Sequence, residues 1–217
     1  MNEVLDMDKK KKFTTLITIL TTILVIVFGG YQIVKARANV TVVDNSGYEA
    51  HNNSFAIRSN ATDYQKEVYA SLNAAIKEKD EEAIATLIAE NFVADFFTWT
   101  NKLRLNDIGG LQFINKAVIN DVSHSAQDGM YQDMYTYLVE GKVADTLEVV
   151  ATRANAKKGN FKTEEATLDA YIVDLEWDYK ESSVINTSLY QKKAIITLVQ
   201  DEDGLYSIVE VKNNEKK

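Results

Sequence analysis

Cysteine is absent from all 217 residues of the chain, so disulfide bonds, thiolate nucleophiles and cysteine-ligated metal sites are excluded. Proline is absent as well, and histidine occurs only at His51 and His124. Neither histidine has a second one at the spacing of a zinc site. The chain also lacks a Gly-x-Ser-x-Gly nucleophile motif. We therefore expect no catalytic residue, no metal ligand and no cofactor.

Charge is distributed unevenly along the chain. Residues 1–38 hold six basic and three acidic residues, and subtracting these from the totals of 24 and 32 leaves 18 basic and 29 acidic residues in the remainder. The remainder thus has a formal net charge of −11. A domain this acidic repels nucleic acid and anionic lipid headgroups, so we expect neither as a partner.

An uncharged, mostly apolar run of 22 residues extends from Phe13 to Val34. A helix of this length spans about 33 Å, enough to cross a bilayer core of about 30 Å. Four lysines, Lys9 to Lys12, precede the run, whereas only Lys35 and Arg37 closely follow it. This asymmetry predicts a cytoplasmic tail (1–12), a single transmembrane helix (13–34) and a C-terminal domain outside the cytoplasm.

A cleaved signal peptide is the alternative, because Ala36-Arg37-Ala38 satisfies the small-x-small rule for cleavage. The apolar run is longer than the usual signal-peptide core and is followed by charges, which favours an uncleaved anchor. An extracytoplasmic domain without disulfides is more typical of bacteria than of the eukaryotic secretory route.

The segment after the anchor divides into a polar spacer (35–61), a folded domain (62–212) and a disordered tail (213–217). Thr62 and Gln65 match a capping box at the start of a first helix, and Asp80 matches the N-cap of a second. Asp107 is expected to cap a third helix carrying apolar residues up to Val122, and a helical or irregular stretch is expected over 130–141.

Strands follow the helices. Tyr171, Val173, Leu175, Trp177 and Tyr179 alternate with polar residues, which predicts a half-buried strand. We expect a turn at 157–160, a third strand over 190–200, and a hairpin at Asp203-Gly204 leading into a fourth strand over 205–211. This order of elements predicts an α+β domain in which the helices pack on one face of a curved four-stranded antiparallel sheet.

The order of elements resembles the NTF2-like fold, a cone of N-terminal helices and a bent antiparallel sheet, over about residues 62–212. With the membrane anchor, it also resembles the bitopic assembly proteins of type IV secretion and conjugation machines. That resemblance implies a non-enzymatic scaffold that contacts other envelope-complex proteins. It carries over no individual site residues.

Three groups of residues are candidate sites. Asp174, Glu176 and Asp178 share one strand face and could bind a cation, but a solvated face is favoured. Two glycines, Gly109 and Gly110, could receive an anion, but close packing is favoured. A set of five aromatic residues could line a ligand pocket between helices and sheet, although core filling is favoured. These are Phe96, Phe97, Trp99, Trp177 and Tyr179.

These features predict a membrane-anchored assembly or scaffold protein of a bacterial cell-envelope complex. The alternative is an extracytoplasmic module that binds a small molecule or a peptide. We expect the isolated domain to be a monomer or a weak homo-oligomer.

The anchor gives the first testable prediction. Protease added to intact cells or spheroplasts should degrade the C-terminal domain, because the run from Phe13 to Val34 places it outside the cytoplasm. Alkaline carbonate should leave the full-length chain in the membrane pellet. A released product beginning at Asn39 would establish the signal-peptide alternative instead.

Overall fold

The computed structural model describes residues 48–50, 55–201 and 204–214. The predicted anchor and most of the predicted spacer lie outside these residues. Among the helices that the structure describes, none combines the length and apolarity that crossing a membrane requires.

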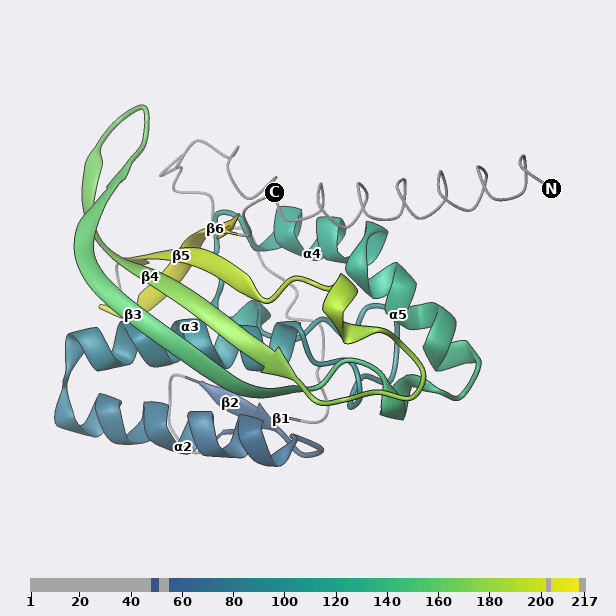
Figure 1. Cartoon of the computed structure of the whole chain (residues 1–217). Helices are drawn as coiled ribbons and strands as arrows, with labels where there is room; N and C mark the ends of the chain where they lie inside the picture. Colours follow the sequence, from purple (N-terminus) through teal and green to yellow (C-terminus); the bar gives the residue numbers. More distant parts are fainter. Residues whose placement is uncertain (1–47, 51–54, 202–203, 215–217) are drawn as a thin grey trace.

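Four α-helices and a four-stranded antiparallel sheet make up most of the described chain (Figure 1), as the α+β prediction required. The helices are α2 (Asp63–Glu78), α3 (Glu81–Phe96), α4 (Ile119–Asp128) and α5 (Met130–Val139). The sheet contains β3 (Val149–Lys162), β4 (Thr167–Tyr179), β5 (Lys193–Gln200) and β6 (Tyr206–Asn213), in that order. A separate pair consists of β1 (Tyr48–Ala50) and β2 (Ala56–Arg58). Short 3-10 turns occur at η1 (Leu111–Phe113), η2 (Val143–Asp145) and η3 (Thr187–Leu189).

Helix α3 lies against the sheet and α2 packs on α3, while α4 and α5 form a second pair near one end of the sheet (Figure 1). The first two helices begin at their predicted caps. Thr62 Oγ1 accepts from the backbone N–H of Gln65, and Gln65 Oε1 accepts in return from that of Thr62. Asp80 Oδ1 accepts from Ala83 N at the start of α3. Both helix starts are therefore confirmed.

The core lies between α3 and the inner face of the sheet. The alternation predicted for β4 is confirmed, because Tyr171, Val173, Leu175, Trp177 and Tyr179 are all buried. Their neighbours on β5, which include Ala194, Ile196 and Leu198, extend the same apolar face.

The predicted third helix beginning at Asp107 is wrong. The chain over 107–118 holds only η1, and α4 begins at Ile119. Gly110 has a left-handed φ of 74°, and Asn115 N donates to Ile208 O at 2.9 Å. Attachment to β6 thus replaces the hydrogen bonds that a helix would have made.

The predicted turn at 157–160 is also wrong, since these residues lie inside β3. Gly159 is not a turn glycine. A Cβ added there would lie 2.6 Å from Ile172 Cδ1, so its small size makes room for that side chain. The turn falls at 163–166, where Thr163 N donates to Ala166 O at 2.8 Å.

The limits predicted for the domain also need correction at both ends. Part of the predicted spacer belongs to the fold, because Phe55, Arg58 and Ala61 are buried. At the other end β6 continues to Asn213, and Asn214 Nδ2 donates to Asp174 Oδ1 at 3.1 Å. The first two residues of the predicted tail, Asn213 and Asn214, therefore belong to the fold, and residues 215–217 lie outside the described chain.

The two faces of β4 give the second prediction. Leu175→Ala should lower the free energy of unfolding by about 2–5 kcal/mol, because it leaves a cavity in a fully buried site. Glu176→Ala, on the opposite face, should leave it nearly unchanged, because the ion pair it removes is exposed. Chemical denaturation of both variants measures the difference. A larger loss for Glu176→Ala would contradict the assignment of the faces.

Candidate functional site

Two cations and two carboxylates meet inside the domain and form its most unusual polar feature, named here the buried charge network. Arg58 ends β2, Asp95 lies in the last turn of α3, and Lys102 and Asp107 follow in the next loop. Side chains of these types are seldom buried unless they are paired. All four have side chains no more than 12% exposed.

Asp95 is the centre of the buried charge network. Its Oδ1 atom lies 2.9 Å from Arg58 Nε and 2.8 Å from Lys102 Nζ. Arg58 also reaches Asp107, with 2.6 Å between Nη1 and Oδ1. The two positive and two negative charges balance, so the network carries no net charge.

The Lys102 ammonium group, which is fully buried, uses all of its hydrogen-bonding capacity. It donates to the main-chain oxygen of Asp95 at 2.8 Å, to Asp95 Oδ1 at 2.8 Å and to Asn101 Oδ1 at 3.2 Å. An ammonium group has three hydrogens to donate, so these contacts saturate it. Asn101 Nδ2 in turn donates to Gln65 Oε1 at 2.8 Å, which joins the network to the capped end of α2.

The glycine pair closes the network from the other side. Gly110 N donates to Asp95 Oδ2 at 2.8 Å, and Gly109 N donates to Tyr131 Oη at 2.8 Å. A Cβ added at Gly109 would lie 2.2 Å from the main-chain oxygen of Asp95. The glycines are required by close packing, as the sequence favoured, and the anion that Gly110 receives belongs to the protein itself.

Electrostatic interactions within the network oppose the effect of burial on the pKa values of Asp95 and Lys102. Burial alone would raise the pKa of Asp95, but the charges of Lys102 and Arg58 and the hydrogen bonds from Lys102 and Gly110 lower it below its usual value. Burial lowers the pKa of Lys102 to about 8, against the opposing effect of Asp95. Burial also raises the pKa of the Tyr131 phenol, which donates to Phe96 O at 2.9 Å.

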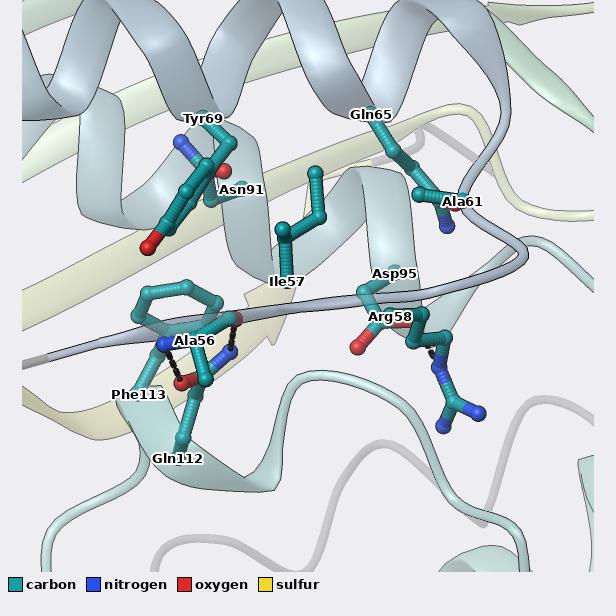
Figure 2. Close-up of a pocket in the computed structure, with 10 residues that line it drawn as sticks. All are labelled: Ala56, Ile57, Arg58, Ala61, Gln65, Tyr69, Asn91, Asp95, Gln112 and Phe113. Atoms are coloured by element: carbon teal, nitrogen blue, oxygen red, sulfur yellow. Dashed lines mark hydrogen bonds and ion pairs between the residues drawn. The ribbon is translucent and has the colours of Figure 1, made fainter. Parts of the chain in front are cut away.

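A small cavity of about 20 Å³ borders the network (Figure 2). Arg58 and Asp95 lie at one end, and Tyr69 and Phe113 lie at the other. The Gln112 amide bonds to both backbone groups of Ala56, at 2.8 and 2.7 Å, and so holds β2 in place. A volume of this size accommodates about one water molecule.

This arrangement is suited to holding the fold together rather than to chemistry. A lysine that acts as a nucleophile or base needs a free lone pair, and a general acid or base must reach its substrate. Lys102 is saturated and enclosed, and both Asp95 oxygens already accept hydrogen bonds. The network therefore ties β2, the end of α3 and the following loop into one unit.

The five aromatic residues proposed for a pocket are all buried in the core. Phe97 lies against Trp177, with ring centroids 4.6 Å apart, and Phe96 lies against Phe97 at 5.1 Å. Trp99 instead contacts Tyr190, and Tyr179 Oη donates to Gln191 O at 2.9 Å. None of the five lines the cavity of Figure 2. All five therefore belong to the main hydrophobic core and fill it.

The acidic row on β4 carries ion pairs with the adjacent strands. Arg153 of β3 lies 2.6 Å from Asp178, with Nη1 facing Oδ2, and Lys193 of β5 pairs with Glu176. Asp174 is exposed on the same face. This is the solvated face that the alternation predicted. Among the described residues, no cluster of three metal-ligating side chains occurs, and His124 lies on α4.

Sequence reasoning missed the buried charge network. Arg58 fell within the predicted spacer, and Lys102 stood in a loop with no periodicity to mark it as buried. The one available signal was the glycine pair, whose expected close packing turned out to be against Asp95 itself.

Neither a protein-family model, nor a curated protein, nor a solved structure matches this chain.

The network gives the third prediction. Asp95→Asn should lower the free energy of unfolding at pH 7 by about 3–5 kcal/mol, because it leaves Lys102 and Arg58 buried without their shared carboxylate. Because the folded state lowers the pKa of Asp95, its contribution is complete above about pH 4 and is lost as the pH falls further. The variant should therefore lose less stability than the wild type on acidification, as measured by denaturation at a series of pH values.

Asp63→Asn is the matched control, because Asp63 forms an exposed ion pair with Lys66. Its stability should stay close to that of the wild type. An Asp95→Asn protein that is more stable than the wild type but inactive in cells would contradict the structural role and mark Asp95 as a functional residue.

Proposed function

We propose that this protein is a non-enzymatic, membrane-anchored assembly protein of a bacterial cell-envelope complex. In this proposal residues 13–34 span the membrane with the N-terminus in the cytoplasm, and the domain outside it is an NTF2-like cone. The machines that fit best are conjugation and type IV secretion channels, whose bitopic components this chain resembles.

The observation that carries the proposal is the way in which the buried charges are used. Asp95, Lys102 and Arg58 bond to one another and to the backbone, so they stabilise the domain instead of facing a substrate. A domain built in this way contributes a rigid surface. The uncharged run behind Lys9 to Lys12 supplies the means of holding that surface at a membrane.

The small-molecule alternative receives less support. The cavity in Figure 2 has room for about one water molecule, whereas ligand pockets usually measure about 300–1,000 Å³. A hollow of about 480 Å³ at α3 is large enough, but it is open to solvent and lined by the carboxylates of Asp80, Glu82 and Glu90, whereas ligand pockets are mostly apolar. The five aromatic residues considered for a larger pocket are buried in the core, where Phe96, Phe97 and Trp177 pack on one another. Peptide binding at the surface of the domain is compatible with the assembly role.

The fourth prediction separates an assembly protein from an enzyme. Asp174→Asn, Glu176→Gln, Asp178→Asn and His124→Gln should each complement a deletion strain at normal protein levels, because a contact surface does not depend on one polar group. Removing residues 13–34 should abolish complementation even where the domain still folds. The measurement is the rate of transfer or secretion through the complex, alongside the amount of protein in the membrane.

One result would overturn this function. If Asp178→Asn eliminated activity while stability and membrane level stayed normal, the solvated face of β4 would be a site for a metal or a substrate.

A further inference from the structure

Strand β3 forms one edge of the sheet and is unusually long. It contains 14 residues and pairs along one side with β4, and no other described strand pairs with it. The pairing of β4 with β5 begins only at Ala170. The end of β3 and the start of β4 therefore project beyond the sheet as a two-stranded arm, visible at the upper left of Figure 1.

The arm is held by its own apolar contacts. Phe161 and Leu168 pack against a small cluster formed by Ala170, Val199 and Val209. This cluster lies on the face of the sheet opposite the main core, since Tyr171 and Leu198 point to the other face. A fixed arm presents the outer edge of β3 in a defined shape, which reduces the ordering cost of binding.

The charge of β3 is opposite to that of the domain. The strand holds Arg153, Lys157, Lys158 and Lys162 and no acidic residue, although residues 39–217 have a formal net charge of −11. Arg153 pairs with Asp178. The three lysines are exposed and form no ion pair among the described residues, and Lys158 Nζ lies 5.8 Å from the centre of the Tyr171 ring.

The lysines occupy both faces of the edge. Lys158 and Lys162 stand opposite Tyr171 and Thr167 and share the face of the main core. Lys157 stands opposite Ile172 and points to the other face. A strand added along β3 would therefore meet positive charge above and below its own plane.

We propose that the open edge of β3 takes up an extended acidic segment of a partner protein as an additional strand. Main-chain hydrogen bonds to the unpaired edge would supply affinity, and carboxylates opposite the lysines would supply selectivity. Lysines on an exposed edge oppose pairing with apolar or basic strands, so the same side chains restrict the choice of partner.

Charge argues against the other occupants of this edge. A second copy of the chain would bring two β3 edges together and oppose lysines to lysines. An anionic membrane or a nucleic acid would meet the exposed Glu164 and Glu165 at the tip of the arm. A strand lying along the side of the arm avoids the tip.

This contact rests on the proposed assembly function and belongs to it. The fifth prediction tests the contact by direct binding. Full-length protein in neutral detergent is titrated into a fluorescein-labelled peptide of about eight residues. In this peptide two glutamates are followed by a valine and a threonine, and the pattern repeats, so that both faces of an added strand carry glutamate. Fluorescence anisotropy should show binding to this peptide and weaker binding to one with lysines in place of the glutamates. The same glutamate peptide with alternate N-methylated amides keeps its charge but loses donors, so it should bind poorly.

Variants assign the contact to the strand. Lys157→Glu with Lys158→Glu should weaken peptide binding by about tenfold or more, since reversing two cations replaces attraction by repulsion. Lys66→Glu with Lys77→Glu makes the same change in charge on exposed positions of α2 and should leave binding unchanged. Circular dichroism confirms that both proteins are folded.

Equal binding of the N-methylated peptide, or equal binding by the β3 variant, would overturn the proposal. Competition by phosphatidylserine vesicles or single-stranded DNA as strong as that by unlabelled peptide would overturn it in favour of a general anion surface. Two results together would reject this contact and leave the assembly function in place. The protein would fail to bind the peptide, and complementation would be lost only when residues 13–34 are removed.

Discussion

The carboxylate of Asp95 is the point on which the described structure depends most. It is bonded by Arg58, Lys102 and Gly110, which come from three different segments of the chain. Removing charged groups from water costs several kcal/mol for each ion, and the contacts between them must offset that cost. The geometry at Asp95 does so because both carboxylate oxygens and all three ammonium hydrogens of Lys102 have partners. The contacts of Lys102 and Gly110 with Asp95 fix the path of the loop that follows α3.

Much of the fold could be predicted because the signals for it are local. A capping box needs only two residues three positions apart, and Thr62 with Gln65 forms one. The alternation in β4 is likewise a property of consecutive residues, and it correctly placed Leu175 inside and Glu176 outside. The five aromatic residues had been expected to fill the core, and size together with spacing was sufficient to place them there.

What could not be predicted depends on contacts between distant segments. Arg58 and Asp95 are 37 positions apart, and nothing near Arg58 in the sequence indicates that it pairs with a buried carboxylate. The chain after Asp107 has apolar residues at helical spacing, yet hydrogen bonds to β6 and the left-handed Gly110 keep it from forming a helix there. Gly159 resembled a turn residue and instead makes room for Ile172. In each case a tertiary contact outweighed the local preference.

The position of β2 affects how the domain responds to mechanical load. The chain enters the described fold through β1 and β2 before it reaches α2, and Gln112 and Asp95 both bind residues of β2. A force applied at the N-terminal side would therefore act first on the pairing of β1 with β2, next on the hydrogen bonds at Ala56 and the ion pairs at Arg58, and only afterwards on the helices. Because those bonds connect directly to the end of α3 and the glycine pair, tension would be distributed into the centre of the domain rather than peeling one helix from its surface.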